Sequence, residues 1–123
     1  MAHVLVVDDS STMRGIVASF LTQNGFEVAV ATDGRDGLDQ LQRDPAIRLV
    51  LSDVNMPNMD GLTMAEKIRN ELGNKDVRIV MLTTEDNVVM RSRGREIGVT
   101  GWIVKPFRGE AVLGPFRKLC GMA

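Results

Sequence analysis

Short apolar runs that alternate with longer amphipathic segments limit this chain to few folds. Five runs recur along the sequence, and four of them are nearly continuous instead of alternating with polar residues. A continuous run is typical of a strand buried on both faces, as the strands of a parallel sheet are. The runs span residues 4–7, 28–31, 49–51, 79–82 and 102–104.

The segments between the runs show the periodicity of amphipathic helices. Apolar residues recur every three or four positions, which places them on one helical face. The clearest sets are Met13, Ile16, Val17, Phe20 and Leu21, and Leu62, Ala65, Ile68 and Leu72. Strand followed by helix, repeated along the chain, predicts an α/β fold of (βα)5 type with an open, doubly wound, five-stranded parallel sheet.

Glycine and proline mark where the expected helices end. The residue before a proline resists helical geometry, and glycine favours the position just after a helix. The fifth helical segment contains Gly114 and Pro115. An interior proline costs about 3 kcal/mol or more, so we expect a late start or a kink there. The other helices are expected to end at Gly25, Asp44–Pro45, Gly73 and Gly98, with Asp33–Gly34 beginning the second.

Length and composition narrow the possible functions. The 123 residues fit a single domain over 1–123 with no output domain. The 15 Lys and Arg residues nearly balance 16 Asp and Glu residues, which argues against binding to nucleic acid or a membrane surface. We find no signal-peptide pattern and no apolar run near the roughly 18 residues of a membrane span. We expect a soluble, cytoplasmic protein in which the one cysteine, Cys120, is an inert apolar residue.

Polar side chains that carry chemistry follow four of the five expected strands. Because the carboxyl ends of parallel strands meet at one edge of a sheet, we expect these groups to converge. Crowded carboxylates repel one another unless a cation joins them. Oxygen ligands of this kind suit Mg²⁺, and a lysine suits phosphate oxygens. The residues are Asp8 and Asp9, Ser52 and Asp53, Thr83 and Thr84, and Lys105.

Each of these residues also has a simpler interpretation. Asp9 or Ser10 can cap the first helix, and Thr83 can cap the fourth. Asp53 can be a turn residue, and Lys105 a solvated surface charge. Taken together, these roles do not explain why such groups gather at only one edge of the sheet.

The chain resembles the response-regulator receiver family in four segments, at the family's spacing and over essentially its whole length. They read VLVVDDSSTMR, LVLSDVNMPNMDGL, IVMLTT and GWIVKPF. The chain is similar above all to stand-alone chemotaxis-type (CheY-like) regulators, the phosphoproteins of two-component phosphorelay signal transduction. The resemblance implies a flavodoxin-like sheet with strand order 2-1-3-4-5 and a signal switched by phosphorylation.

The resemblance implies that Asp53 is the phosphoacceptor. It also implies that Mg²⁺ is bound by Asp9, by Asp53 and by the backbone carbonyl of Asn55, with Asp8 acting through a metal-bound water. Phosphoryl transfer needs alignment and charge neutralisation more than covalent assistance, and a metal ion and a lysine supply both.

Further residues are implied to contact the phosphoryl group or to respond to it. Thr83 would donate its hydroxyl to one phosphoryl oxygen, and Lys105 would pair with another. As Thr83 moves, the aromatic ring of Trp102 would change position; a static Trp102 packed against a helix is the alternative. Asn55 and Glu85 flank the route by which water approaches phosphorus, and are implied to set the lifetime of the phosphorylated state.

Partners follow from the same resemblance. A histidine kinase would supply the phosphoryl group, because the only histidine, His3, precedes the first strand. A downstream target would dock on the face of the fourth helix, fifth strand and fifth helix, and the basic residues there favour an acidic peptide. We expect a monomer that catalyses only its own phosphorylation and dephosphorylation. The basic residues are Arg91, Arg93, Arg95, Arg108, Arg117 and Lys118.

Two other classes of protein share parts of this pattern. A haloacid-dehalogenase-like, Mg-dependent phosphatase also uses an aspartate on an α/β sheet, but it requires a second Asp where this chain has Asn55. A flavodoxin-like binding module needs a glycine-rich phosphate loop after the first strand, where Asp8 and Asp9 would instead repel a phosphate. The receiver interpretation is favoured over both.

Overall fold

The computed structural model describes residues 3–122, and its strands form one parallel sheet in the order β2-β1-β3-β4-β5. This confirms both the (βα)5 α/β fold and the expected strand order. The strands are β1 (Val4–Val7), β2 (Val28–Ala31), β3 (Leu49–Ser52), β4 (Arg78–Thr83) and β5 (Gly101–Val104).

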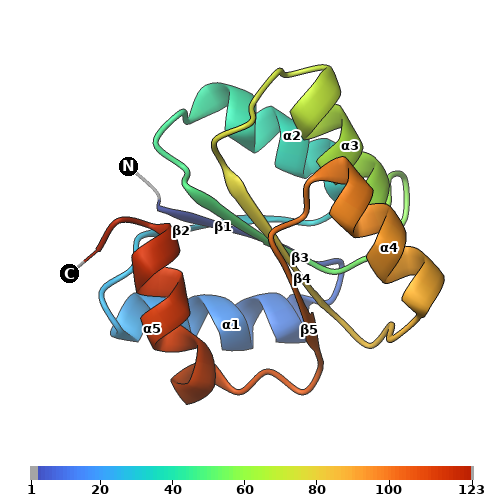
Figure 1. Cartoon of the computed structure of the whole chain (residues 1–123). Helices are drawn as coiled ribbons and strands as arrows, with labels where there is room; N and C mark the ends of the chain where they lie inside the picture. The colour runs from blue at the N-terminus through green and yellow to red at the C-terminus, as the bar shows by residue number, and fades with distance from the viewer. Residues whose placement is uncertain (1–2, 123) are drawn as a thin grey trace.

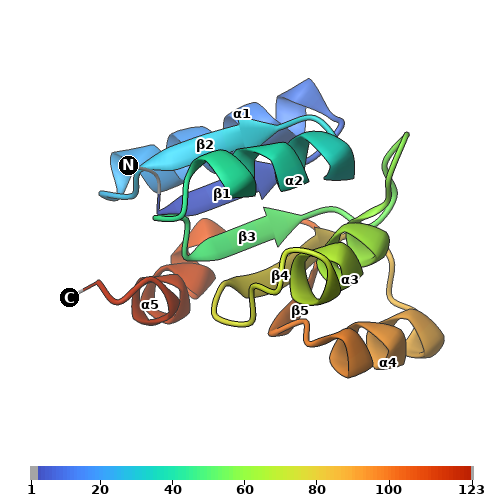
Figure 2. The same cartoon turned by 90° about the horizontal axis from the view of Figure 1, so that it is seen from above.

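Helices cover both faces of the sheet. In Figures 1 and 2, α1 and α5 lie on one face, and α2, α3 and α4 lie on the other. The helices are α1 (Ser11–Gln23), α2 (Gly34–Arg43), α3 (Gly61–Asn70), α4 (Val88–Ile97) and α5 (Gly109–Leu119).

Strand β1 shows why the apolar runs are continuous. It lies between β2 and β3, and all of its residues are buried. Leu5 and Val7 pack with apolar residues of α2 and α3, whereas Val4 and Val6 pack with those of α1 and α5. Successive side chains of a strand point to opposite faces, so a strand covered on both sides needs an apolar residue at every position.

Polar side chains cap four of the helices at their first turn. Ser10, Asp33, Asp60 and Asn87 each accept a hydrogen bond from a backbone N–H of the helix that follows. These bonds satisfy N–H groups that have no partner within the helix. Ser10, and not Asp9, therefore caps α1, and Asn87, and not Thr83, caps α4.

The helix ends agree with the sequence at Gly25, Asp44 and Gly98. Gly25 (φ 91°) follows the last turn of α1, Asp44 caps α2, and Gly98 (φ 104°) caps α4. The two glycines adopt left-handed backbone geometry, which a Cβ disfavours. Gly73 lies a little beyond the end of α3 at Asn70, because the chain completes one more turn before the loop.

Helix α5 differs from the sequence-based expectation. It runs from Gly109 to Leu119 with Pro115 inside it, so the expected late start is wrong. Proline lacks the N–H that would bond to the carbonyl of Ala111, but Ala111 and Pro115 are both exposed, so water can reach that face of the helix. The next residue, Phe116, is buried in the core on the α1 side of the sheet, and this packing favours a continuous helix.

No helix in the described range 3–122 is long and apolar enough to cross a membrane. The last turn of α5 leads to Cys120, which is buried in the core on the α1 side of the sheet. Burial raises the pKa of the Cys120 thiol to about 11.

The buried thiol of Cys120 is expected to be unreactive in the folded protein. With its pKa near 11, about one thiol in a thousand is ionised at pH 8, and only the thiolate is nucleophilic. Iodoacetamide should therefore label the native protein far more slowly than the same protein in guanidinium chloride. Equal labelling rates in the two conditions would contradict the burial of Cys120.

Candidate functional site

The candidate site lies at the carboxyl edge of the sheet. In Figure 2 the strand arrows point to the same side of the molecule, where the loops leading into the helices begin. The ends of β1, β3, β4 and β5 deliver Asp8, Asp53, Thr83 and Lys105 to this edge. Residues that are far apart in the sequence thus become neighbours.

Asp8 and Asp9 follow β1 and differ in their surroundings. Asp8 is 4% exposed, and its Oδ1 accepts a hydrogen bond of 2.9 Å from the backbone N–H of Ser10. Arg14 donates from Nη1 to the backbone carbonyl of Asp8 at 2.7 Å. Asp9 is exposed. One carboxylate is therefore fixed by the turn into α1, and the other faces solvent beside it.

Asp53 is positioned by the pairing of β3 with β1. Its backbone N–H donates to the carbonyl of Val7 at 3.0 Å, which extends the sheet by one step beyond β3. Its Oδ1 accepts a hydrogen bond of 2.7 Å from the N–H of Val54. The side chain is 14% exposed, and because Oδ1 is held by Val54, Oδ2 is the oxygen that faces Lys105.

Gly61, at the start of α3, allows the helix to approach the backbone of Asp53 and Val54 closely. Its N–H donates to the carbonyl of Val54 at 2.8 Å, and a Cβ at this position would collide with the backbone oxygen of Asp53. The first residue of α3 therefore packs directly on the backbone of the candidate phosphoacceptor, and any side chain at Gly61 would displace it.

Lys105 joins two of the carboxylates. Its Nζ lies 3.2 Å from Oδ2 of Asp8 and 3.3 Å from Oδ2 of Asp53. Burial of the Lys105 side chain opposes its charged form, but the charges of Asp53 and Asp8 and their hydrogen bonds outweigh burial and raise the pKa of the ammonium. Lys105 therefore remains a cation at this site.

The carboxylates of Asp8, Asp9 and Asp53 fit a metal ion. One oxygen from each lies within 4.8 Å of the others. Three carboxylates against the single ammonium of Lys105 leave an excess of negative charge, which a divalent cation would neutralise. All of these donors are hard oxygen atoms, as Mg²⁺ prefers.

Thr83 ends β4 between the other groups and is completely buried. Its Oγ1 accepts a hydrogen bond of 3.2 Å from the N–H of Glu85. Within residues 3–122, no hydrogen bond joins Thr83 to Asp53. The structure thus places Thr83 at the site edge but in contact with the β4–α4 loop.

A series of contacts connects the site to β5. The side chain of Asn55 donates from Nδ2 to Oε1 of Glu85 at 2.6 Å. The backbone carbonyl of Glu85 accepts a hydrogen bond of 2.8 Å from Nε1 of Trp102. Trp102 is half-buried and packs against the core on the α4 side. The β4–α4 loop therefore contacts both the loop after Asp53 and the indole of β5.

Several of these contacts could not be predicted from the sequence. Arg14 at the backbone of Asp8, and Glu85 as a partner of both Asn55 and Trp102, depend on how loops approach each other in space. Helical periodicity marks Arg14 only as a position of α1. The basic residues of α4 and α5 do not all face the same way. Arg117 of α5 donates to the carbonyl of Asn24 at the end of α1, away from α4.

Comparison with known proteins agrees with this geometry. A family model described as the response regulator receiver domain matches residues 4–114. A chemotaxis protein CheY homolog of Campylobacter jejuni is 40% identical over 110 residues, which cover 89% of this chain and 85% of the relative. The chain therefore belongs to the response-regulator receiver domain family.

Solved structures lead to the same family. Chemotaxis protein CheY4 of Vibrio cholerae superposes with a TM-score of 0.87 at 39% identity, covering 97% of this chain and 98% of that one. Response regulator protein TrrA of Thermotoga maritima, in complex with Mg²⁺–BeF, superposes with a TM-score of 0.82 at 29% identity, covering 97% and 99%. Nothing in these comparisons supports the phosphatase or the flavodoxin-like alternative.

Substitution of Gly61 tests the packing of α3 on Asp53. Gly61→Ala is expected to reduce the free energy of unfolding by about 1–3 kcal/mol, because the added Cβ forces the loop apart. Urea denaturation measures the change. Gly15→Ala is the matched control, since a Cβ there meets nothing within 4 Å and alanine favours the helix α1. An equally small effect of both substitutions would contradict the close packing at Gly61.

Proposed function

We propose that this chain is a phosphorylation-activated response regulator of chemotaxis-like, two-component signalling, with Asp53 as its phosphoacceptor. The observation that carries this proposal is the position of Asp53. Its Oδ2 lies 3.3 Å from the Lys105 ammonium and belongs to the same cluster of oxygens as Asp8 and Asp9. A nucleophilic carboxylate beside a cation and a metal-binding cluster is suited to phosphoryl transfer.

Different residues of the chain would orient the nucleophile, bind the phosphoryl oxygens and hold the metal ion. The N–H of Val54 fixes one oxygen of Asp53 and leaves the other to attack phosphorus in line with the leaving group. As the acyl phosphate forms, Lys105 exchanges its contact with Asp53 for one with a phosphoryl oxygen. Mg²⁺ held by Asp9, Asp53 and the carbonyl of Asn55, with Asp8 acting through water, would neutralise phosphoryl charge during attack. The relative from T. maritima, whose structure contains Mg²⁺–BeF, supports this choice of ion.

Thr83 and Trp102 are proposed as the residues that respond. The Thr83 hydroxyl accepts from the N–H of Glu85, so its own proton is available to a phosphoryl oxygen. A shift of Thr83 would move the β4–α4 loop, whose Glu85 carbonyl bonds to the Trp102 indole. The phosphoryl group would thus be reported at the face formed by α4, β5 and α5.

The proposed partners are a histidine kinase as phosphodonor and a downstream target protein that docks on that face through an acidic segment. The protein is proposed to act in the cytoplasm as a monomer, and to catalyse no reaction other than its own phosphorylation and dephosphorylation. The family membership supports the kinase, and the exposed arginines of α4 support the acidic segment.

Phosphorylation at Asp53 tests the proposed function. Incubation with acetyl phosphate and Mg²⁺ is expected to add one phosphoryl group, which mass spectrometry after hydroxylamine cleavage should locate at Asp53. Asp53→Asn should abolish the label, because an amide is not a nucleophile at phosphorus, whereas Asp39→Asn on the exposed side of α2 should not. A label that persists in Asp53→Asn, or that a chelator leaves unaffected, would refute the assignment.

The lifetime of the phosphorylated state is expected to depend on Asn55 and Glu85. Asn55 lies two residues after Asp53 and donates a hydrogen bond of 2.6 Å to Glu85, and we expect self-dephosphorylation on the order of a minute or less. Replacing both with leucine should exclude water and lengthen the lifetime by tenfold or more, equivalent to about 1.4 kcal/mol of barrier. Glu85→Gln, which can still accept the bond from Asn55, is the control. Loss of the label followed over time measures the rate, and a half-life of hours in the unchanged protein would contradict the proposal.

A further inference from the structure

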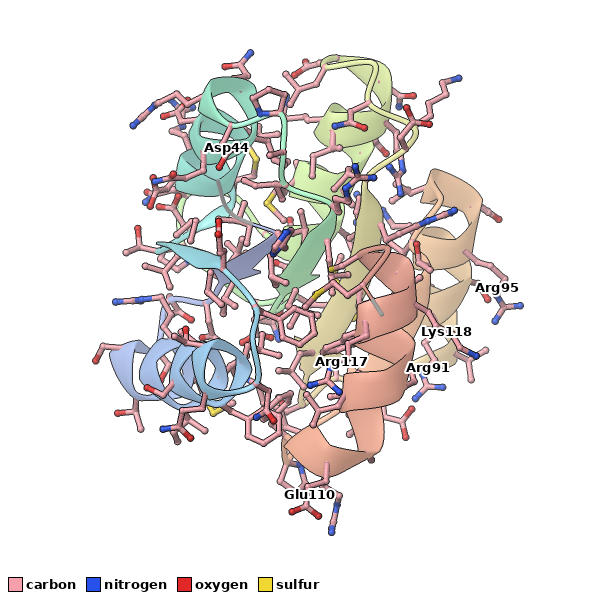
Figure 3. The ribbon with its side chains drawn as sticks, turned by 90° about the vertical axis from the view of Figure 1, so that its left-hand side faces the viewer. Asp44, Arg91, Arg95, Glu110, Arg117 and Lys118 are labelled. Carbon is pink, nitrogen blue, oxygen red and sulfur yellow. The ribbon has the colours of Figure 1, made fainter. Side chains whose placement is uncertain are left out.

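A hollow on the surface between α4 and β5 combines positive charge with an aromatic wall. In Figure 3, Arg91 and Arg95 of α4 and Lys118 of α5 point toward the same side of the molecule. The charge on this side favours an acidic occupant. The hollow is lined by Arg91, Arg95, Val99, Thr100, Gly101 and Trp102.

Arg91 is held in this hollow by a carboxylate of the chain itself. Its Nη2 lies 2.7 Å from Oδ1 of Asp86, and its guanidinium carbon lies 6.0 Å from the centre of the Trp102 ring. The two charged side chains are 38% and 65% exposed. An ion pair this exposed is weak, so a competing carboxylate can replace Asp86.

The contact with Asp86 leaves Arg91 incompletely satisfied. Its Nε is buried and has no hydrogen-bond partner within residues 3–122. A guanidinium binds a carboxylate best through two parallel N–H groups, and Asp86 contacts Arg91 through Nη2. Arg91 can therefore gain a hydrogen bond if its side chain leaves Asp86 and turns Nε toward the surface, where one carboxylate of a partner can contact both nitrogens.

The loop that carries Asp86 is also the loop that contacts the candidate phosphorylation site. Asp86 follows Glu85, whose side chain accepts from Asn55 and whose carbonyl accepts from Trp102. A displacement of residues 85–86 would loosen the Trp102 indole and remove Asp86 from Arg91 in one movement. The candidate site and the side chain of Arg91 are therefore connected by direct contacts through residues 85 and 86.

We propose that Arg91 binds a carboxylate of an acidic partner segment in this hollow, and that Asp86 is an internal competitor which occupies Arg91 until the β4–α4 loop shifts. The competition itself needs no phosphorylation, whereas the release of Arg91 rests on the function proposed above. A partner can distinguish the two positions of the loop only if it binds them with different affinities. Asp86 would create this difference, because it competes for Arg91 in one position and not in the other.

The competition is tested with a fluorescein-labelled oligoglutamate peptide and the unphosphorylated full chain. Asp86→Asn is expected to tighten binding about two- to fivefold, the range that an exposed ion pair allows. Asp39→Asn on α2 changes the net charge equally and should have a much smaller effect. Fluorescence anisotropy measures the affinity, and circular dichroism confirms that each variant is folded.

Two further measurements locate the effect. In Arg91→Gln the gain from Asp86→Asn should vanish, as a double-mutant cycle requires when two residues act on each other. The peptide should also shift the indole N–H resonance of Trp102, which is the only tryptophan in the chain. Equal gains from Asp86→Asn and Asp39→Asn, or a gain that survives Arg91→Gln, would overturn the competition.

A final comparison separates this inference from the proposed function. With Mg²⁺ and beryllofluoride, the unchanged protein should approach the affinity of Asp86→Asn, whereas that variant should change little. If the Asp86 and Arg91 variants behave as expected but beryllofluoride labels Asp53 without changing peptide affinity, the release by the loop is overturned. If Asp53 does not bind beryllofluoride at all, the proposed function fails while the competition at Arg91 stands.

Discussion

The contacts of the Lys105 ammonium with Asp8 and Asp53 connect the carboxyl ends of three strands. Lys105 directly follows β5, and β4 lies between β5 and β3 in the sheet. The Lys105 side chain must therefore extend across the end of β4 to contact the two carboxylates. Buried carboxylates would repel one another without this cation. Thr83, at the end of the intervening strand β4, is completely buried.

This balance of charge also determines what the site can do. One ammonium does not neutralise the three carboxylates of Asp8, Asp9 and Asp53, so the edge of the sheet attracts a further cation. A phosphoryl group that arrives with such a cation can take the place of carboxylate oxygens around Lys105. In the function proposed above, the ammonium of Lys105 that stabilises the unphosphorylated site would also contact the phosphoryl group.

The β4–α4 loop connects this edge of the sheet with the surface of α4 and β5. Glu85 contacts Asn55 through its side chain and Trp102 through its backbone, and Asp86 contacts Arg91 on α4. These bonds are few and partly exposed, in contrast to β4, which is buried from Ile79 to Thr83. A segment with such weak local contacts can adopt a second arrangement while the sheet remains unchanged.

Most of the fold could be predicted from the sequence, because the signals are local. Continuous apolar runs mark strands buried on both faces, and the residues that end those runs become the edge of the sheet. Gly25, Asp33 and Gly98 mark helix ends because caps and left-handed turns involve only a few neighbouring residues. The expectation of a late start for α5 was wrong because it considered only the local effect of Pro115. The packing of Phe116 in the core outweighs that effect.

The sequence by itself determined that Asp8, Asp9, Asp53 and Lys105 would share one edge, since strand direction alone brings them there. Only the tertiary structure decided which atoms meet. Three contacts join residues of separate elements: the bond between Asn55 and Glu85, the bond from the Trp102 indole to the Glu85 carbonyl, and the pairing of Asp86 with Arg91. Such contacts depend on rotamers and on how helices pack against the sheet, and neither leaves a periodic trace in the order of the residues.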